Sequence, residues 1–204
     1  MKHDCRLIIF AKAPVPGFAK TRLAPLLGMD GAARLAAKML AHTLDTAQVA
    51  AIGPVELCCA PDTTHAQFGR AARRAGVVVT AQGLGELGER MQRALARGLA
   101  RHRAVVLIGT DAPWLDADTL RSAAHALRSH DAAIAPASDG GYVLVGLSRP
   151  APALFANVAW STSAVMAQTR ACIAGLGMTL HELPTFHDID EPGDLAHLPQ
   201  GWLV

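Results

Sequence analysis

The fold of this chain is decided by the stretch LIGTDAP, residues 107–113, which continues the apolar run that begins at Ala104. A short run of aliphatic and β-branched residues is typical of a central parallel strand that is covered on both faces. Gly109 lets another group approach the backbone closely, and Pro113 stops the strand. In an open α/β sheet, ligands bind beyond the carboxyl ends of the strands. Asp111 therefore stands where a carboxylate could hold a hard cation such as Mg2+.

Asp111 has a second interpretation, as the cap of the helix that follows. An Asp just before a helix accepts hydrogen bonds from the first free backbone N–H groups. The spacing predicts this helix over residues 117–129, and Asp116 lies closer to its start. We therefore assign the cap to Asp116 and favour the metal interpretation for Asp111.

Short apolar runs and helical repeats alternate along the sequence. Asp30 is expected to cap a first long helix beginning at Gly31, with Leu35, Met39 and Leu44 on its apolar face. Gly175 and Gly177 are expected to end a later helix. Strands are predicted at residues 6–12, 55–60, 77–80, 104–108, 131–136, 142–147 and 178–183.

The size and composition favour one layered α/β domain over residues 1–204. Hydrophobic residues make up 51% of the 204 residues but aromatic residues only 4%, so the core is built from Ala, Leu, Val and Ile. The net charge of +2 is too small to indicate a nucleic-acid partner. The four cysteines lack metal-ligand spacing and are expected to be reduced thiols. With no signal-peptide pattern and no run near the roughly 18 apolar residues of a membrane span, we expect a cytoplasmic protein without a membrane partner.

A long loop, residues 13–23, follows the first predicted strand. It carries two prolines, Gly17 and the cations Lys20 and Arg22. A loop in this position suits a nucleotide, because cations and backbone amides can face its phosphates. The loop has neither the Walker spacing nor the GxGxxG spacing. An ordinary solvated loop is an equally good interpretation of the motif alone.

A glycine-rich segment, QGLGELGERM at residues 82–91, precedes another predicted helix. Such a loop at a helix start could admit a flat base or a phosphate. Glycine clusters are also common in flexible connections, and this interpretation is slightly favoured for the segment in isolation.

Two later motifs follow predicted strands. DGGY at residues 139–142 is a strong turn signal, and its amides could also line an acceptor pocket. Its tyrosine either touches a ligand or packs in the sheet. STS at residues 161–163 is expected to supply a capping hydroxyl to the next helix, and that helix end could also bind an anion.

The last motif is HDIDEP at residues 187–192. Asp188 and Asp190, two residues apart in an extended segment, point the same way and could complete a cation site with Asp111. Alternatively, Asp190 caps a terminal helix over residues 192–198, which has Pro near its first position. Both roles can hold, with the cap on Asp190 and the metal on Asp188.

Taken in order, these motifs resemble a bacterial family of GT-A-fold proteins described as glycosyltransferase-like. The resemblance rests on KTRLAP (20–25), GTDAP (109–113), DGGY (139–142), WSTS (160–163) and DID (188–190), and extends from about Leu7 to Leu198. The chain is also similar to 2-phospholactate guanylyltransferase and, more distantly, to molybdenum cofactor guanylyltransferase. The resemblance implies the fold of nucleotide-diphospho-sugar transferases, a three-layer α/β/α arrangement with a mostly parallel central sheet.

The resemblance also implies a set of site residues. Lys20, Arg22 and Asp111 would be catalytic, with the two cations facing phosphates. Asp111, Asp188 and Asp190 would hold Mg2+ or Mn2+. The nucleotide would contact Ala11, Lys12, Lys20, Arg22, Gly85, Gly88 and Arg90, and the acceptor would contact Gly140, Gly141, Tyr142, Ser161, Thr162 and Ser163.

The function expected from these residues is metal-dependent nucleotidyl transfer from a nucleoside triphosphate to a small phosphorylated or acidic acceptor. Glycosyl transfer from a nucleotide sugar is the alternative. Metal-dependent glycosyltransferases of this fold usually carry a DxD pair, whereas Gly109 and Pro113 flank Asp111 at these spacings. A non-catalytic nucleotide-binding protein is a third hypothesis. The partners are expected to be small molecules, and a homodimer is left open.

Overall fold

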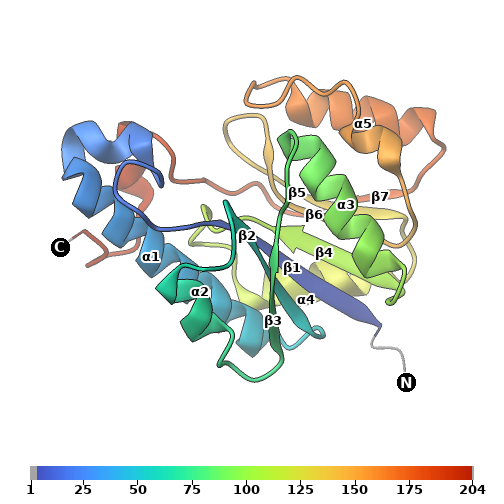
Figure 1. Cartoon of the computed structure of the whole chain (residues 1–204). Helices are drawn as coiled ribbons and strands as arrows, with labels where there is room; N and C mark the ends of the chain where they lie inside the picture. Colours follow the sequence, from blue (N-terminus) through green and yellow to red (C-terminus); the bar gives the residue numbers. More distant parts are fainter. Residues whose placement is uncertain (1–3, 204) are drawn as a thin grey trace.

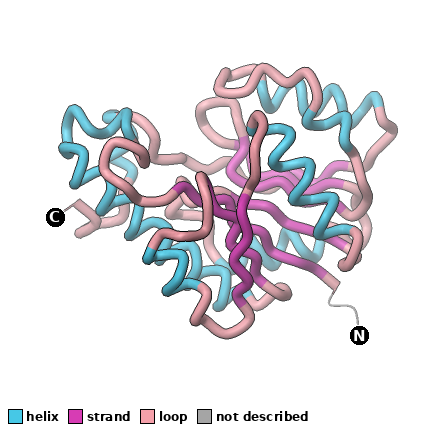
Figure 2. Tube along the Cα trace, in the orientation of Figure 1, coloured by secondary structure: helices cyan, strands magenta, loops and turns pink. Residues whose placement is uncertain are grey.

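The computed structural model describes residues 4–203, and within them seven strands form one sheet with helices on both faces (Figures 1 and 2). The strand order is β3-β2-β1-β4-β6-β5-β7. β6 runs antiparallel to β4 and β5, and the other pairs are parallel. The predicted three-layer fold with a mostly parallel sheet is therefore confirmed. The strands are β1 Cys5–Lys12, β2 Val55–Ala60, β3 Val77–Ala81, β4 Ala104–Ile108, β5 Ala132–Pro136, β6 Tyr142–Leu147 and β7 Leu180–Glu182.

The helices divide between the two faces of the sheet. The core on one face includes side chains from α1, α2 and α4, and the core on the other includes side chains from α3 and α5. The α-helices are α1 Ala24–Ala50, α2 Ala66–Ala71, α3 Leu87–Leu99, α4 Ala117–Ala126 and α5 Val165–Gly175; the 3-10 helices are η1 Thr21–Leu23, η2 Pro152–Phe155 and η3 Pro192–His197.

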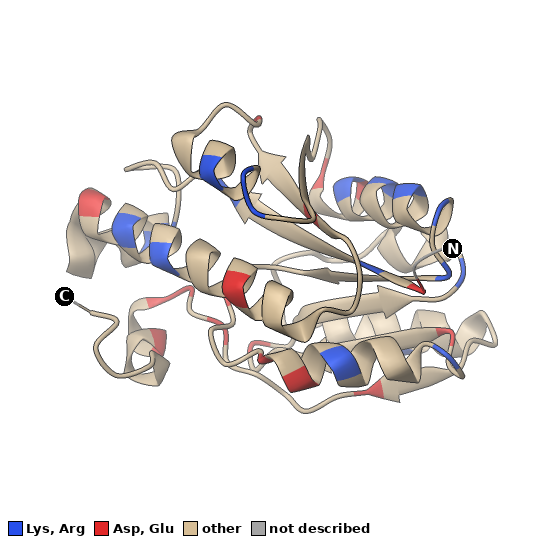
Figure 3. Cartoon of the chain, turned by 90° about the horizontal axis from the view of Figure 1, so that it is seen from below, with Lys and Arg blue, Asp and Glu red and all other residues tan. Residues whose placement is uncertain are grey.

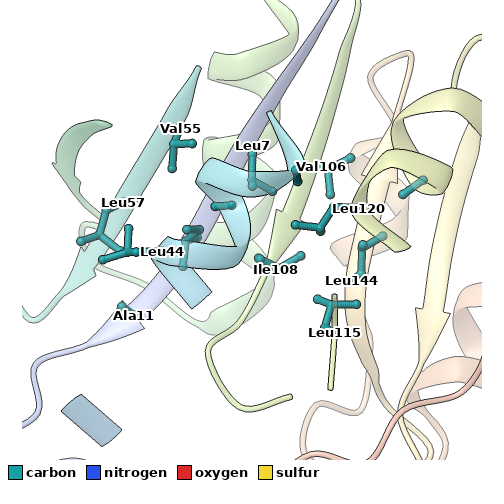
Figure 4. Close-up of a cluster of buried hydrophobic side chains, with 14 of the residues drawn as sticks. Leu7, Ala11, Leu44, Val55, Leu57, Val106, Ile108, Leu115, Leu120 and Leu144 are labelled. Carbon is teal, nitrogen blue, oxygen red and sulfur yellow. The ribbon is translucent and has the colours of Figure 1, made fainter. Parts of the chain in front are cut away.

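The central strand β4 shows why the sheet needs both helical layers. Successive side chains of a strand point to opposite faces. Val106 and Ile108 enter the core on the α1 and α4 side, whereas Val105 and Leu107 enter the core on the α3 side. Every residue of β4 is buried, as predicted for a central strand. Figure 4 shows the first of these cores, where Leu44 of α1 and Leu120 of α4 meet the side chains of β1, β2 and β4.

A third apolar cluster joins the end of the chain to the beginning of α1. Ile189 is fully buried there with Leu23, Leu35 and Met39, and Trp202 packs against the same cluster. The segment after β7 thus returns to the region of the first loop, and in Figure 1 its red trace lies beside the blue beginning of α1. Sequence-distant polar groups are brought together by this return.

The first long helix begins earlier than predicted. It starts at Ala24, not Gly31, and Asp30 is not its cap. Pro25 lies in its first turn, a position that proline favours, and Gly28 interrupts the helix with a φ of 69°. The predicted apolar face is nevertheless correct, since Leu35, Met39 and Leu44 are buried.

Two further predicted caps are wrong. The N-cap of α5 is Ala164, which offers no side-chain acceptor. Thr162, two positions before the N-cap, accepts a bond through Oγ1 from Ala164 N at 3.3 Å. The terminal helix is a 3-10 helix capped by Glu191 together with Asp194, not by Asp190. The expected cap of α4 is confirmed, because Asp116 Oδ1 accepts a bond from Thr119 N at 2.8 Å.

The structure also bears on the cysteines and on membrane-spanning helices. All four cysteines are free thiols, as expected. None of the helices within residues 4–203 combines the length and apolar character that crossing a bilayer requires. Figure 3 shows both signs of charge on α1, where Asp30 and Asp45 accompany Arg34 and Lys38.

Candidate functional site

Two acidic segments far apart in the sequence lie side by side beyond the sheet. Asp111 follows β4, and residues 188–190 follow β7. The backbone N–H of Ile189 donates to the carbonyl of Asp111 at 2.8 Å, and the Ile189 side chain is anchored in the cluster on α1. The convergence of the central Asp with the late acidic pair is therefore present, as the sequence predicts.

Lys20 lies between the two acidic segments. Its Nζ forms ion pairs with Asp111 Oδ1 and, at 2.7 Å, with Asp190 Oδ1, and it donates to the carbonyl of Ile189 at 2.5 Å. The Lys20 side chain is only 7% exposed, whereas the carboxylates of Asp111 and Asp190 are 44% and 46% exposed. The backbone of Lys20 is left-handed, with φ 51° and ψ 40°, which is uncommon for a residue other than glycine. The structure thus places Lys20 beneath the acidic groups.

The charges of this cluster are not balanced. Burial alone would lower the pKa of Lys20, but the neighbouring carboxylates of Asp111 and Asp190 raise it, so the ammonium stays charged. Burial, followed by the charges of Asp139, Asp190 and Asp111, raises the pKa of Asp188 to about 6. Four carboxyl groups therefore gather here, and only two of them, Asp111 and Asp190, pair with the Lys20 ammonium, so the negative charge suits a further cation.

The donor set fits a hard divalent cation that arrives with phosphates. Carboxylate oxygens are the ligands that Mg2+ prefers, and Mg2+ is usually held by one or two carboxylates plus substrate phosphates. Within residues 4–203, no group of three or more His, Cys, Asp or Glu side chains is arranged to hold a metal ion. The site accordingly has the chemistry for a nucleotide-borne cation but not a complete protein cage.

Arg22 is the more accessible cation of the first loop. It lies in η1, and its Nη1 approaches Glu191 Oε1 at 3.3 Å with both side chains exposed. Exposed pairs of this kind contribute little to stability. Arg22 can therefore leave Glu191 for a stronger anion at small cost. Lys12, at the end of β1, is also exposed.

The glycine-rich segment is tied to the first strand through Gln82. The side chain of Gln82 is buried; its Nε2 donates to the carbonyls of Cys58 at 3.1 Å and Ala11 at 3.4 Å. Its Oε1 accepts from Arg90 Nη1 at 3.0 Å. Ala11 and Arg90, both predicted to contact the nucleotide, are thus linked by a residue that sequence reasoning missed. The available signal was a polar residue directly after a predicted strand.

Gly85 and Gly88 have packing reasons to be glycine. Gly85 has a φ of +103°, and a Cβ there would overlap Glu89 Oε2, which closes the capping box of α3. A Cβ on Gly88 would lie 2.6 Å from the carbonyl oxygen of Phe155 and 2.7 Å from Trp160 Nε1. Beside Gly88 there is a cavity of about 370 Å³, which Asn157 and Trp160 also line. The segment is therefore more constrained than a flexible turn.

The two predicted acceptor motifs contact each other. Gly140 has a φ of +94°, and a Cβ there would lie 2.6 Å from Ser163 Cα. The Gly140 carbonyl accepts from Met166 N at 2.8 Å. Tyr142 packs edge-on against Trp160, and burial raises the pKa of its phenol. The structure brings these motifs together, and their contact with an acceptor stays a prediction.

Asp139 is the second residue whose role sequence reasoning missed, because it was not predicted to belong to the acidic cluster. Its Oδ1 accepts a bond from Gly141 N at 2.7 Å, which explains its place in the turn. Its charge is also the largest of the neighbouring charges acting on Asp188. The effect of Asp139 on Asp188 was not predicted, because the turn alone was enough to explain an aspartate at this position.

Comparison with known proteins bears on the fold of the chain. The chain resembles the "putative nucleotide-diphospho-sugar transferase" from Desulfovibrio desulfuricans G20, with 29% identity and a TM-score of 0.84 over 92% of this chain and 83% of that one. It is similar in fold to the manganese complex of Rv0371C from Mycobacterium tuberculosis H37Rv, with 19% identity and a TM-score of 0.57 over 97% and 99% of the two chains. It is likewise similar to a CMP:2-keto-3-deoxy-manno-octonic acid synthetase complexed with CTP, with 12% identity and a TM-score of 0.58 over 95% of each chain.

These neighbours confirm the predicted resemblance to the nucleotide-diphospho-sugar transferases and their nucleotidyltransferase relatives. No curated protein matches the sequence. A family model described as "Uncharacterized protein conserved in bacteria (DUF2064)" matches residues 43–162, which is more than half of the chain. The chain therefore belongs to the bacterial family DUF2064.

Proposed function

We propose that this protein is a nucleotidyltransferase that uses Mg2+ or Mn2+ and transfers a nucleotidyl group from a nucleoside triphosphate to a small phosphorylated or acidic acceptor. The observation that carries the proposal is the meeting of Asp111 with residues 188–190 beside the first loop. Neighbours that hold manganese and CTP support the same assignment.

The chemistry follows from the groups at the site. An ionised acceptor oxygen forms a bond to the α-phosphorus, the bond from that phosphorus to the bridging oxygen breaks, and pyrophosphate leaves. An acceptor that is already ionised needs no general base. Arg22, exposed beside the acidic cluster, stabilises the charge that develops on the leaving pyrophosphate. A cation bound through Asp111 and Asp188 would supply further neutralisation of phosphate charge.

The acceptor would be held by side chains more than by the turn amides. Gly140 N already donates to the carbonyl of Ala137 at 3.2 Å, and Gly141 N donates to Asp139. Ser161 and Ser163 are exposed in the facing loop. Their hydroxyls are therefore the groups that we assign to an acceptor phosphate or carboxylate.

The experiment is pyrophosphate release from each of the four common nucleoside triphosphates, with Mg2+ or Mn2+ and a panel of phosphorylated acceptors. We expect release with at least one pair and a loss of at least 100-fold in Asp111→Asn. Asp118→Asn is the matched control, because Asp118 is an exposed carboxylate on α4 that pairs with Arg121 away from the cluster. Equal activity of Asp111→Asn and wild type would refute the assignment of Asp111.

Glycosyl transfer is the second candidate, and the name of the neighbour at 29% identity favours it. It predicts release of a nucleoside diphosphate from a nucleotide sugar and no pyrophosphate from triphosphates. A third result, cation-dependent nucleotide binding without turnover on either panel, would identify a binding protein and reject both transferase assignments.

A further inference from the structure

The ammonium of Lys20 has no unused donor. A lysine ammonium carries three N–H groups. Three acceptors surround it: Asp111 Oδ1, Asp190 Oδ1 and the carbonyl of Ile189. The side chain is almost fully buried. In this position Lys20 cannot donate to a phosphate without giving up one of the three acceptors, although its loop resembles a phosphate-binding loop.

The same contacts occupy oxygens that a divalent cation would use. The carboxylates of Asp111 and Asp190 are half-exposed, and the Oδ1 atom of each forms an ion pair with the Lys20 ammonium. The positive charge therefore sits where these two carboxylates meet. Two of the three predicted metal ligands are thus paired with a lysine.

We propose that Lys20 is an internal counterion of the acidic cluster and competes with a divalent cation for the carboxylates of Asp111 and Asp190. This inference rests on the proposed function for the identity of the cation site. When the cation binds, Lys20 withdraws from at least one carboxylate. The released ammonium is then free to pair with a nucleotide phosphate, to which charge-assisted hydrogen bonds are strong.

The competition has a thermodynamic consequence. A ligand that binds only after a contact is broken binds more tightly once a second ligand stabilises the open arrangement. Cation and nucleotide should therefore each raise the affinity for the other. The coupling would keep the protein largely free of cation until a nucleotide is present.

The test is Mn2+ binding to the full chain without nucleotide, measured from the electron paramagnetic resonance signal of free Mn2+. We expect Lys20→Met to bind Mn2+ at least tenfold more tightly than wild type. Arg22→Met is the matched control. It also removes one positive charge, two residues further along the chain, but the side chain that it removes pairs with Glu191. We expect it to change the affinity less than threefold. Affinity in Lys20→Met that is equal to or weaker than that of wild type would overturn the inference.

A second measurement uses the wild-type chain and so does not depend on the folding of a variant. Acetic anhydride labels accessible lysine amines, and mass spectrometry reports each lysine separately. Saturating Mn2+ should raise the labelling of Lys20 severalfold and leave Lys38 unchanged, because Lys38 donates to the Gly201 carbonyl and lies over the Trp202 ring instead of pairing with the acidic cluster. Unchanged labelling of Lys20 at saturating Mn2+ would also overturn the competition.

The outcomes separate this inference from the proposed function. If wild type and Lys20→Met bind Mn2+ with equal affinity and the wild type releases pyrophosphate, only the competition is rejected. Absence of Mn2+ binding in both proteins, together with absence of pyrophosphate release, would reject the proposed function and the inference built on it.

Discussion

Glu56 is a buried carboxylate in the parallel strand β2, with a side chain only 2% exposed. Its oxygens contact Arg6 Nε at 2.9 Å, Thr80 Oγ1 at 2.7 Å and the guanidinium of Arg97. Burial alone would raise the pKa of Glu56, but the bonds from Thr80 and Arg97 and the charges of Arg97 and Arg6 lower it below the ordinary value. The ionised form is therefore the form that the fold stabilises.

Glu56→Gln should lower the free energy of unfolding by about 3 kcal/mol at pH 7, because it leaves a buried arginine without its partner charge. Since the folded-state pKa of Glu56 is lowered, its stabilisation is present above the unfolded value of about 4.3 and is lost as the pH falls through the folded value. The wild-type free energy should thus fall below pH 4.3 more steeply than that of the variant. Urea unfolding at pH 7 and at several pH values below 5 measures both effects.

Glu182→Gln is the control for Glu56→Gln. Glu182 also pairs with an arginine, Arg170, in two bonds of 2.8 Å, and this pair lowers the pKa of Glu182. Both side chains are partly open to water, which screens the charges. We expect a much smaller loss than for Glu56→Gln, and equal losses would contradict the role of burial.

At the residue scale, the sequence predicted which residue types gather at the site better than it predicted which of them contact one another. Asp111 stood out because it follows a buried strand and lies at a predictable edge of the sheet, and Asp188 because it pairs with Asp190 two residues along an extended segment. The contacts of Lys20 with Asp190 and Ile189 span about 170 positions in sequence. A single sequence contains no signal for such a contact, because the position of Lys20 depends on how the last segment packs on α1.

Among the elements, the turn before β6 and the loop before α5 form one packed unit. Gly140 joins them, since its φ of +94° and the proximity of the Ser163 backbone leave no room for a side chain.

The apolar runs predicted the bounds of the strands to within two residues, and the error was largest for β7, which is short and only partly buried. Helix starts were less predictable: Pro25 lies in the first turn of α1 and Gly28 interrupts that helix, whereas the Thr162 hydroxyl lies two positions before the N-cap of α5.

Gly140→Ala should lower the free energy of unfolding by about 2 to 3 kcal/mol, because it combines an unfavourable φ with backbone overlap. It should also weaken any acceptor binding, since the loop at residues 161–163 must move. Gly193→Ala is the control, because a Cβ there meets nothing within 4 Å and its φ is not positive; we expect a change within about 0.5 kcal/mol. Urea unfolding of the two variants decides, and equal stability of both would contradict the packing argument.

For the whole molecule, the decisive arrangement is the return of the last segment to α1. Sequence patterns predicted the layers and the convergence of acidic segments, because parallel strands place their carboxyl ends at one edge. They did not predict the third apolar cluster, in which Ile189 meets Leu23, Leu35 and Met39. Its members are spread over most of the chain, and no local period connects them.

Ile189→Ala should lower the free energy of unfolding by about 3 kcal/mol, the usual cost of truncating a buried aliphatic side chain. It should also weaken Mn2+ binding about tenfold or more, because the flanking residues Asp188 and Asp190 lose the side chain that holds their segment in place. Ile173→Ala is the matched control: Ile173 is nearly as buried, but it lies in the cluster on the α3 and α5 side. We expect a similar stability loss there with unchanged Mn2+ affinity. An unchanged affinity in Ile189→Ala would show that the anchor does not position the carboxylates.

The tie between Lys20 and residues 189–190 also sets an order of events during synthesis. The ribosome makes the lysine about 170 residues before Ile189 and Asp190, so a nascent chain exposes this cation to water until they emerge. Of the three acceptors that surround the lysine in the folded protein, Asp111 alone is made before them. The site should therefore close only after residues 189–190 have left the exit tunnel, when all seven strands of the sheet have already been synthesised.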